Sequence, residues 1–247
     1  MRFAGYLQTS LIEWPGKVAA VLFTGGCNFR CPFCQNSALV DESLLKKTKW
    51  IEGRGILADL AARKKWIDGV CVTGGEPCLW GEELMVFLTG VKDLGMETMV
   101  ETNGSKPEAI KEMIGKNLVD YWATDFKVML DDYRRLVGGK NTSVDLIQDV
   151  QESWKLMLNS GRYVEFRTTV VPGIHDGEKL AEMGRWLHDF VGESAGEKVT
   201  WVLQRFLPQN CLDPEYLKIV SHTEGQMEEL WKKTRKTCSF VRLRDGA

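Results

Sequence analysis

Short apolar runs that favour β-strands alternate along this chain with stretches of helical spacing, and this alternation most constrains its fold. The β-rich runs are Val18–Thr24, Gly69–Thr73, Glu97–Val100, Tyr121–Thr124, Tyr163–Val171 and Val199–Phe206. The helical stretches are Gly55–Trp66, Glu82–Leu94, Pro107–Ile114, Val144–Asn159, Lys179–Phe190 and Gln226–Lys236. Six β–α units of this kind predict an α/β fold with a parallel sheet and crossover helices. Periodicity alone fits both an open sheet and a partial barrel.

No internal repeat and no linker divides the 247 residues. We therefore expect one domain over residues 1–247, with a core at about 15–210 and a helix-and-strand extension at about 211–247. The polar stretch Asp131–Asn141, with its Gly138-Gly139 pair, predicts a loop or short insertion.

The overall charge and hydropathy argue against several partners. A formal net charge of -2 does not favour bulk capture of nucleic acid or anionic lipid. The longest apolar runs are far shorter than a bilayer span, and the N-terminus lacks the residue order of a signal peptide. We expect a cytoplasmic protein with no membrane or nucleic-acid partner.

Three of the seven cysteines lie in one short loop directly after the first predicted strand. Cys27, Cys31 and Cys34 have the spacing C-x3-C-x2-C. In a reducing compartment, clustered cysteines favour metal binding or thiolate chemistry over disulfides. Three thiolates can hold three corners of an iron–sulfur cubane, and the lack of a fourth nearby Cys leaves one iron open to a substrate group. Gly25 and Gly26 let the backbone turn close to such a cluster.

A zinc or structural thiol site is the simpler alternative for this loop. Zinc prefers four ligands, and His175, His188 and His222 all lie far away in sequence. Cys71 is expected to be buried in a strand, and packing is also the favoured role of Cys78. Cys211 and Cys238 are too isolated to argue for a second cluster, although the sequence leaves one open.

Polar residues follow the later predicted strands. They are Gly74-Gly75-Glu76-Pro77, Glu101-Thr102-Asn103-Gly104, Asp125-Phe126-Lys127, Arg167 and Leu207-Pro208-Gln209-Asn210. The carboxyl ends of parallel strands meet at one edge, where α/β folds bind ligands. A lone residue of this kind is more often a cap or a solvated charge, but together they predict a polar site on one rim.

The C-x3-C-x-aromatic-C motif resembles the signature of the radical S-adenosylmethionine (SAM) superfamily. The resemblance implies a partial (β/α)6 barrel and a [4Fe–4S] cluster held by Cys27, Cys31 and Cys34. It implies that the open iron chelates the amino and carboxylate groups of SAM and that Phe33 packs by the adenine. The GGE segment, Gly74, Gly75 and Glu76, would bind the SAM amino group.

The polar residues and the segment Gly5–Lys17 most resemble the glycyl radical enzyme activases, in particular the anaerobic ribonucleoside-triphosphate reductase activating proteins. By this resemblance Lys127 and Arg167 meet the SAM carboxylate or ribose, and Thr102 and Asp125 match a monovalent-cation site. Two positions depart from the pyruvate formate-lyase activase: Glu101 replaces an Asp, and Asn210 replaces a His near the adenosine. Asn103 belongs to the same predicted cofactor-binding set.

The resemblance implies that the protein cleaves SAM reductively to a 5′-deoxyadenosyl radical, which removes hydrogen from a glycine of a partner glycyl radical enzyme. Flavodoxin or ferredoxin would supply the electron. Two alternatives remain open: a radical SAM enzyme acting on a small molecule, as 7-carboxy-7-deazaguanine synthase does, and a non-catalytic metal-binding or redox-sensing protein.

Overall fold

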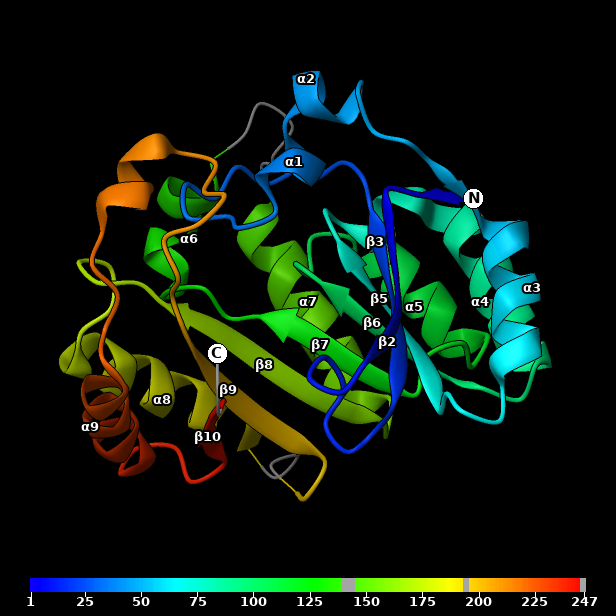
Figure 1. The fold of residues 1–247 in the computed structure, drawn as a ribbon. Coiled ribbons are helices and arrows are strands. Elements are labelled where there is room, and N and C mark those ends of the chain that lie inside the picture. Colours follow the sequence, from blue (N-terminus) through cyan, green and yellow to red (C-terminus); the bar gives the residue numbers. More distant parts are fainter. Residues whose placement is uncertain (139–144, 193–195, 245–247) are drawn as a thin grey trace.

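The computed structural model, which describes residues 1–138, 145–192 and 196–244, is built around one eight-stranded sheet flanked by helices (Figure 1). The strand order is β10-β9-β8-β7-β6-β5-β3-β2. These strands are β2 (Gly5–Ser10), β3 (Ala19–Thr24), β5 (Gly69–Gly74), β6 (Glu97–Thr102), β7 (Tyr121–Asp125), β8 (Tyr163–Val170), β9 (Val199–Arg205) and β10 (Val241–Leu243). All neighbours are parallel except β2, which runs antiparallel to β3. The six predicted strands are confirmed as the central six.

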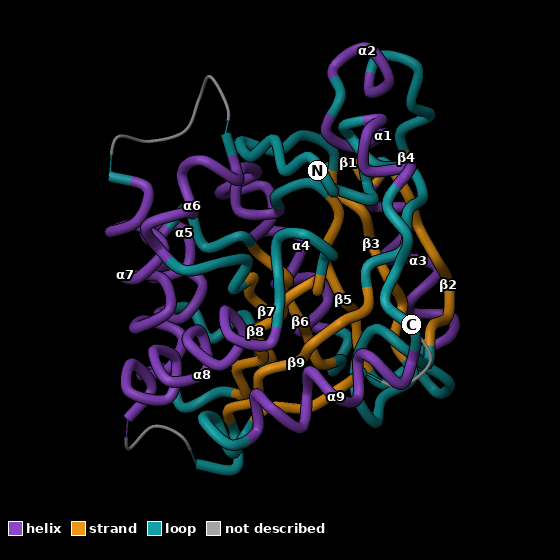
Figure 2. The backbone as a smooth tube through the Cα atoms, turned by 90° about the vertical axis from the view of Figure 1, so that its left-hand side faces the viewer, coloured by secondary structure: helices purple, strands orange, loops and turns teal. Residues whose placement is uncertain are grey.

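The sheet is a partial barrel, because the strand order runs from one edge to the other without a described pairing between β10 and β2. A separate antiparallel pair is formed by β1 (Arg2–Phe3) and β4 (Ile51–Glu52). The short helices α1 (Ser37–Val40) and α2 (Glu42–Leu45) lie above the carboxyl end of β3 (Figure 2).

The predicted helices are confirmed on the outer side of the sheet. The longer ones are α3 (Gly53–Arg63), α4 (Gly81–Asp93), α5 (Pro107–Gly115), α7 (Leu146–Asn159), α8 (Gly177–Val191) and α9 (Glu224–Arg235). Two 3-10 helices, η1 (Pro77–Trp80) and η3 (Pro214–Lys218), lie in loops. Helix α9 begins with a capping box, in which Thr223 and Gln226 satisfy each other's backbone N–H groups.

The loop expected at residues 131–141 is wrong over most of its length, because α6 spans Leu130–Val137. Its charged residues hide an amphipathic pattern, in which Leu130, Tyr133 and Val137 all point into the core. Residues 139–141 of the expected loop lie outside the described residues.

The two faces of the sheet carry different side chains, as strand alternation requires. The outer face joins the large core under the helices, where Trp122, Trp154 and Trp201 are fully buried. Burial of each such ring contributes about 1.5–3 kcal/mol. The inner face carries a smaller cluster that includes Ala19 and Ala123. These short side chains leave room inside the barrel.

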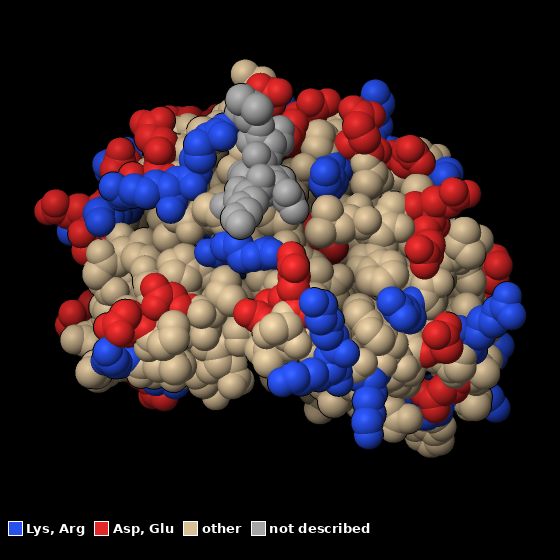
Figure 3. Space-filling model, turned by 90° about the horizontal axis from the view of Figure 1, so that it is seen from above, with Lys and Arg blue, Asp and Glu red and all other residues tan. Residues whose placement is uncertain are grey.

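No helix within the described ranges is both long and apolar enough to cross a bilayer. On the face seen from above, Lys and Arg lie interspersed with Asp and Glu (Figure 3). This mixture agrees with the small net charge of the chain.

Candidate functional site

The loop with the three cysteines begins where β3 ends, and its own hydrogen bonds hold its shape. The N–H of Cys34 donates to the carbonyl of Cys31 at 3.1 Å. The guanidinium of Arg30 donates to the carbonyls of Cys27 and Phe29, at 2.5 and 2.8 Å. The loop is also held from outside, because the N–H of Arg30 donates to the carbonyl of Val137 at 2.7 Å.

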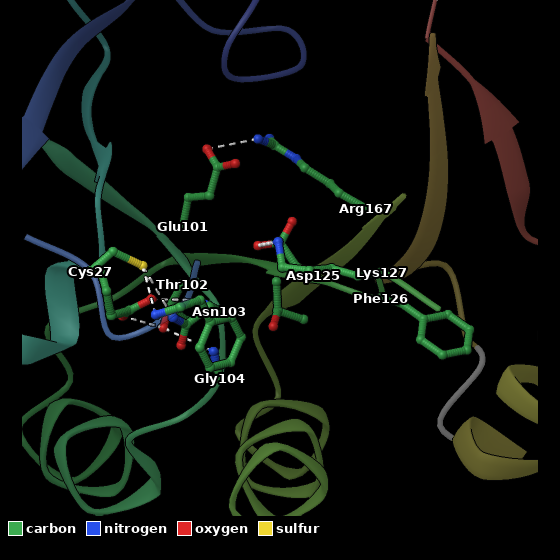
Figure 4. Close-up of polar contacts among 12 residues, drawn as sticks. Cys27, Glu101, Thr102, Asn103, Gly104, Asp125, Phe126, Lys127 and Arg167 are labelled. Atoms are coloured by element: carbon green, nitrogen blue, oxygen red, sulfur yellow. Dashed lines mark hydrogen bonds and ion pairs between the residues drawn. The ribbon is translucent and has the colours of Figure 1, made fainter. Parts of the chain in front are cut away.

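A cavity of about 310 Å³ opens beside this loop. All three predicted cluster ligands line it, and so do most of the predicted SAM-contacting residues. These are Phe33, Gly74, Gly75, Thr102, Asn103, Asp125, Lys127 and Arg167. They come from consecutive strand ends between β3 and β8, and Figure 4 shows several of them pointing toward one another.

The glycine pair after β5 allows the two loops to touch. A Cβ on Gly75 would lie 2.0 Å from the carbonyl oxygen of Gly26, and Gly74 has a φ of +117°. The N–H of Glu76 donates to the same Gly26 carbonyl at 2.7 Å. Packing against the cysteine loop therefore requires the two glycines, whatever ligand contacts they make.

Glu76 is fully buried and braces the end of β6 instead of lining the cavity. Its carboxylate accepts hydrogen bonds from the N–H of Cys78 at 2.9 Å, the hydroxyl of Thr102 at 2.6 Å and the N–H of Asn103 at 2.6 Å. Burial raises the pKa of Glu76, and these hydrogen bonds oppose the rise. Asn210, which has a φ of +55°, is exposed in a turn and is also absent from the cavity wall.

Asn103 connects Cys27 to a polar layer behind it. Its amide Nδ2 lies 3.8 Å from Cys27 Sγ and donates to Asn28 Oδ1 at 3.0 Å. Asn28 in turn donates to the hydroxyl of Ser105 at 2.8 Å. On the other side of the loop, the buried ring of Phe33 packs on Tyr216, with ring centroids 6.3 Å apart.

Lys127 and Asp125 form an ion pair on the cavity wall, with Nζ and Oδ2 2.7 Å apart (Figure 4). Burial alone would lower the pKa of Lys127, but the Asp125 carboxylate together with Cys31 and Tyr133 outweighs it and raises the pKa well above its usual value. The two predicted cation ligands are both engaged within the protein, Asp125 by Lys127 and Thr102 by Glu76.

Arg167 lies in a buried network of charges at the inner end of the cavity. Its guanidinium pairs with Glu101 at 2.9 Å and with Glu165. Arg244, from the residue after β10, adds a contact to Glu165 at 3.2 Å. Burial would raise the pKa of Glu101, but Arg167, a hydrogen bond from Thr73 and Arg244 together outweigh it and lower the pKa. The charge of Arg167 is thus already balanced by protein carboxylates.

The wall or network residues that were missed as site residues include Glu13, Glu165, Gln204 and Arg244. Strand alternation was a usable signal for Glu165, because it shares the inward face with Arg167 two residues later. The predicted strand at 199–206 contains Gln204, but its pattern did not indicate which face of the sheet this side chain occupies. Nothing in the sequence marked Arg244, which reaches the cavity only because β10 pairs with β9.

The donor set fits an iron–sulfur cluster and a zwitterionic ligand. Burial raises the pKa of Cys27 to about 12 and that of Cys31 to about 11, and it also raises the pKa of Cys34. Among the described residues, no three His, Cys, Asp or Glu side chains are placed to hold one metal ion. Cys27, Cys31 and Cys34 all line this cavity, and Cys is the usual ligand of iron–sulfur clusters. The Lys127–Asp125 pair offers both signs of charge to the ligand's own charged groups.

The family model described as the radical SAM superfamily matches residues 21–187, which contain the cysteine loop and most of the sheet. The chain belongs to the radical SAM superfamily. Radical SAM proteins are enzymes that use a [4Fe–4S] cluster and SAM, so the alternative of a non-catalytic metal-binding or redox-sensing protein is excluded.

Three curated radical SAM relatives illustrate the range of similar proteins. The first, from Methanocaldococcus jannaschii, is named "putative glycyl-radical enzyme activating enzyme" and is 28% identical over 98% of this chain and 95% of its own length. Pyruvate formate-lyase-activating enzyme of Clostridium pasteurianum is 27% identical over 68% of each chain. The 7-carboxy-7-deazaguanine synthase of Thermococcus kodakarensis is 26% identical over 57% of this chain and 63% of its own.

Solved structures of radical SAM enzymes share the fold. Streptococcus suis SuiB has a TM-score of 0.62 at 15% identity and is matched over 90% of this chain and 47% of its own. A spore photoproduct lyase has a TM-score of 0.63 at 11% identity, over 98% of this chain and 79% of its own. The chain therefore spans about half the length of SuiB.

Proposed function

We propose that this radical SAM enzyme is an activase, which creates the radical on a glycine of a partner glycyl radical enzyme of the anaerobic ribonucleotide reductase or pyruvate formate-lyase type. The observation that carries the proposal is the similarity to the Methanocaldococcus jannaschii protein, because it covers nearly all of both chains. The similarity to 7-carboxy-7-deazaguanine synthase leaves much of this chain unmatched.

Cys27, Cys31 and Cys34 would hold the [4Fe–4S] cluster, and the cavity beside them would hold SAM. When bound, these two groups supply a carbon radical that can remove a hydrogen atom from an unactivated C–H bond. The protein's own part is to fix their positions and exclude water. Buried Phe29 and Phe33 form apolar walls for this purpose.

The charged wall residues would orient SAM. The side chain of Lys127 is only 13% exposed, so its ammonium can meet the SAM carboxylate with limited competition from water. Asp125 balances Lys127 and can accept hydrogen bonds from the ammonium of SAM. Backbone groups at Gly74 and Gly75 lie on the same wall, where no side chain blocks their approach.

The inner wall of the cavity would face the partner's glycine segment. Glu13 and Arg244 both line this wall, together with Gln204. A carboxylate accepts from peptide N–H groups, and a guanidinium donates to peptide carbonyls, so the wall suits a backbone segment. Glycine has no side chain to prevent close approach of its Cα. Flavodoxin or ferredoxin as electron donor, a monovalent cation beside SAM and a cytoplasmic location remain predictions.

The proposal is tested in two stages on anaerobically reconstituted protein. In the first, iron content and 5′-deoxyadenosine release with SAM and dithionite are compared between wild type and Cys27→Ala, Cys31→Ala and Cys34→Ala. Cys238→Ala is the matched control, because Cys238 is also buried but lies outside the cavity. We expect the three variants to lose the cluster and SAM cleavage and the control to keep both.

In the second stage, the active protein is mixed with anaerobic ribonucleotide reductase or pyruvate formate-lyase, and glycine-centred radical is measured by electron paramagnetic resonance. The same partner with its radical glycine changed to Ala is the control. We expect a doublet with the natural partner and none with the Ala variant. SAM cleavage without a doublet on any such partner would refute the activase proposal and favour the small-molecule alternative.

A further inference from the structure

Three successive backbone carbonyls, from the last residue of β7 onward, are each held by a side chain from a different element. The hydroxyl of Tyr133, in α6, donates to the carbonyl of Asp125 at 3.0 Å. The hydroxyl of Thr168, in β8, donates to the carbonyl of Phe126. His175, in the loop before α8, contacts the carbonyl of Lys127 through Nε2 at 2.7 Å. Side chains outside the segment therefore hold every backbone carbonyl from Asp125 to Lys127.

The hydrogen bonds of His175 define its tautomer. The N–H of Val171 donates to Nδ1 at 3.0 Å, so Nδ1 carries no hydrogen. The hydrogen is on Nε2, which donates to the carbonyl of Lys127. The side chain is only 3% exposed, and burial lowers its pKa to about 4. A neutral imidazole thus links the turn after β8 to the segment after β7.

Lys127 is the charge that this link holds in place. Its side chain lines the same cavity as all three cysteines of the loop. Buried charges interact strongly over short distances, so a small displacement of this ammonium changes what it can stabilise. The position of Lys127 depends on its backbone, and its carbonyl has one described side-chain donor, His175.

We propose that His175 is a positioning residue of the SAM site, which holds the Lys127 ammonium on the cavity wall by donating a hydrogen bond to the Lys127 carbonyl. The proposal rests on the role of Lys127 in SAM binding given under the proposed function. His175 itself lines a separate hollow of about 440 Å³ that also contains Pro32 and Tyr216, so it acts from behind the wall. It makes no contact with SAM in this proposal.

Two substitutions test the two hydrogen bonds of the His175 imidazole separately, because each variant keeps only one of them. The side-chain amide of His175→Gln can reach as far as Nε2 and donate to the Lys127 carbonyl. In His175→Asn, the amide oxygen takes the place of Nδ1 and accepts from Val171, but the donor is lost. A purely structural role would lower thermal stability without this difference in SAM affinity.

The experiment measures SAM binding to reconstituted, unreduced protein by equilibrium dialysis, so that no cleavage occurs. We expect His175→Asn to weaken SAM binding about tenfold, as the loss of one buried hydrogen bond permits, and His175→Gln to stay near wild type. Amide hydrogen exchange at residues 126–128 should rise in the Asn variant only. Thr98→Val is the matched control, because it removes another buried side-chain-to-carbonyl bond at the opposite end of the sheet.

Wild-type affinity in His175→Asn, or equal weakening in both His175 variants, would overturn the proposal. If the Asn variant does not fold, His175→Met fills a similar volume without either hydrogen bond and takes its place, with the same weakening expected. A wild-type protein that holds its cluster but binds no SAM would refute the role of Lys127 as well. A failed glycyl radical assay with intact SAM binding would refute only the activase.

Discussion

Replacement of Gly75 by Ala tests whether the glycine pair serves to pack the cysteine loop. Real Cβ atoms essentially never approach a neighbour within 3.0 Å, whereas a Cβ at Gly75 would lie 2.0 Å from the Gly26 carbonyl oxygen. The loops would therefore have to separate by about 1 Å, the difference between these distances. The obstacle is backbone, so no side-chain rotation relieves it.

The cost follows from the contacts that this separation disturbs. Overpacking costs about 1–3 kcal/mol. The separation also weakens two backbone hydrogen bonds, from Gly75 to Thr24 at 2.9 Å and from Glu76 to Gly26 at 2.7 Å. Each is worth about 0.5–1.5 kcal/mol, so the free energy of unfolding should fall by about 3 kcal/mol. For a chain of this size the melting temperature should drop by about 6–12 °C.

The assay is thermal unfolding of the cluster-free protein, followed by iron uptake during anaerobic reconstitution. Gly55→Ala is the matched control, because a Cβ there meets no heavy atom within 4 Å and the residue lies in α3. Ala in a helix is more stable than Gly by about 0.5–1 kcal/mol, so the control should melt no lower than wild type. Gly75→Ala with wild-type melting and iron uptake would refute the packing argument.

Three further outcomes follow from buried charges and caps. Arg167→Met should cost about 3 kcal/mol in urea unfolding, because it removes the nearest cation from the buried Glu165 and the partly exposed Glu101. The exposed Lys218→Met should cost under about 1 kcal/mol, and equal costs would contradict this. The pKa of His175 is lowered from 6.5 to about 4, so the stability contributed by its neutral form is complete above pH 6.5 and is lost as the pH falls toward 4. The urea midpoint of His175→Gln should fall less over this range than that of wild type. Thr223→Ala should lower the stability by about 1 kcal/mol through loss of the α9 cap, and Thr223→Ser should restore it.

The central sheet could be predicted because its strands are short apolar runs bounded by turn residues. The strand β2 was missed, since half of Gly5–Ser10 is exposed and its polar residues mask the strand pattern. Helix α6 was missed for a similar reason, because charged residues surround its three buried positions. Local patterns identify elements well when most of their residues are buried, and less well at edges.

The candidate site also has a part that local patterns predict and a part that they miss. Motifs at strand ends could be placed on one rim because parallel strands share a direction, and most of these residues do line one cavity. Glu76 was predicted to contact SAM, and in the structure its carboxylate accepts hydrogen bonds from Thr102 and two backbone N–H groups. No one-dimensional pattern indicates which way a side chain turns at a strand end. The contribution of Arg244 depends on a pairing between distant segments and was beyond local inference.

The cavity wall combines Glu13, near the start of the chain, with Arg244, near the end of its described part. During synthesis on the ribosome, β10 can join β9 only after α9 has emerged and turned back. On a nascent chain the cavity would therefore lack Arg244, and Glu165 would lack its contact with that guanidinium, until β10 has emerged. The order of the elements thus places completion of this cavity after the strands that form the rest of its wall, because β10 pairs with β9 last.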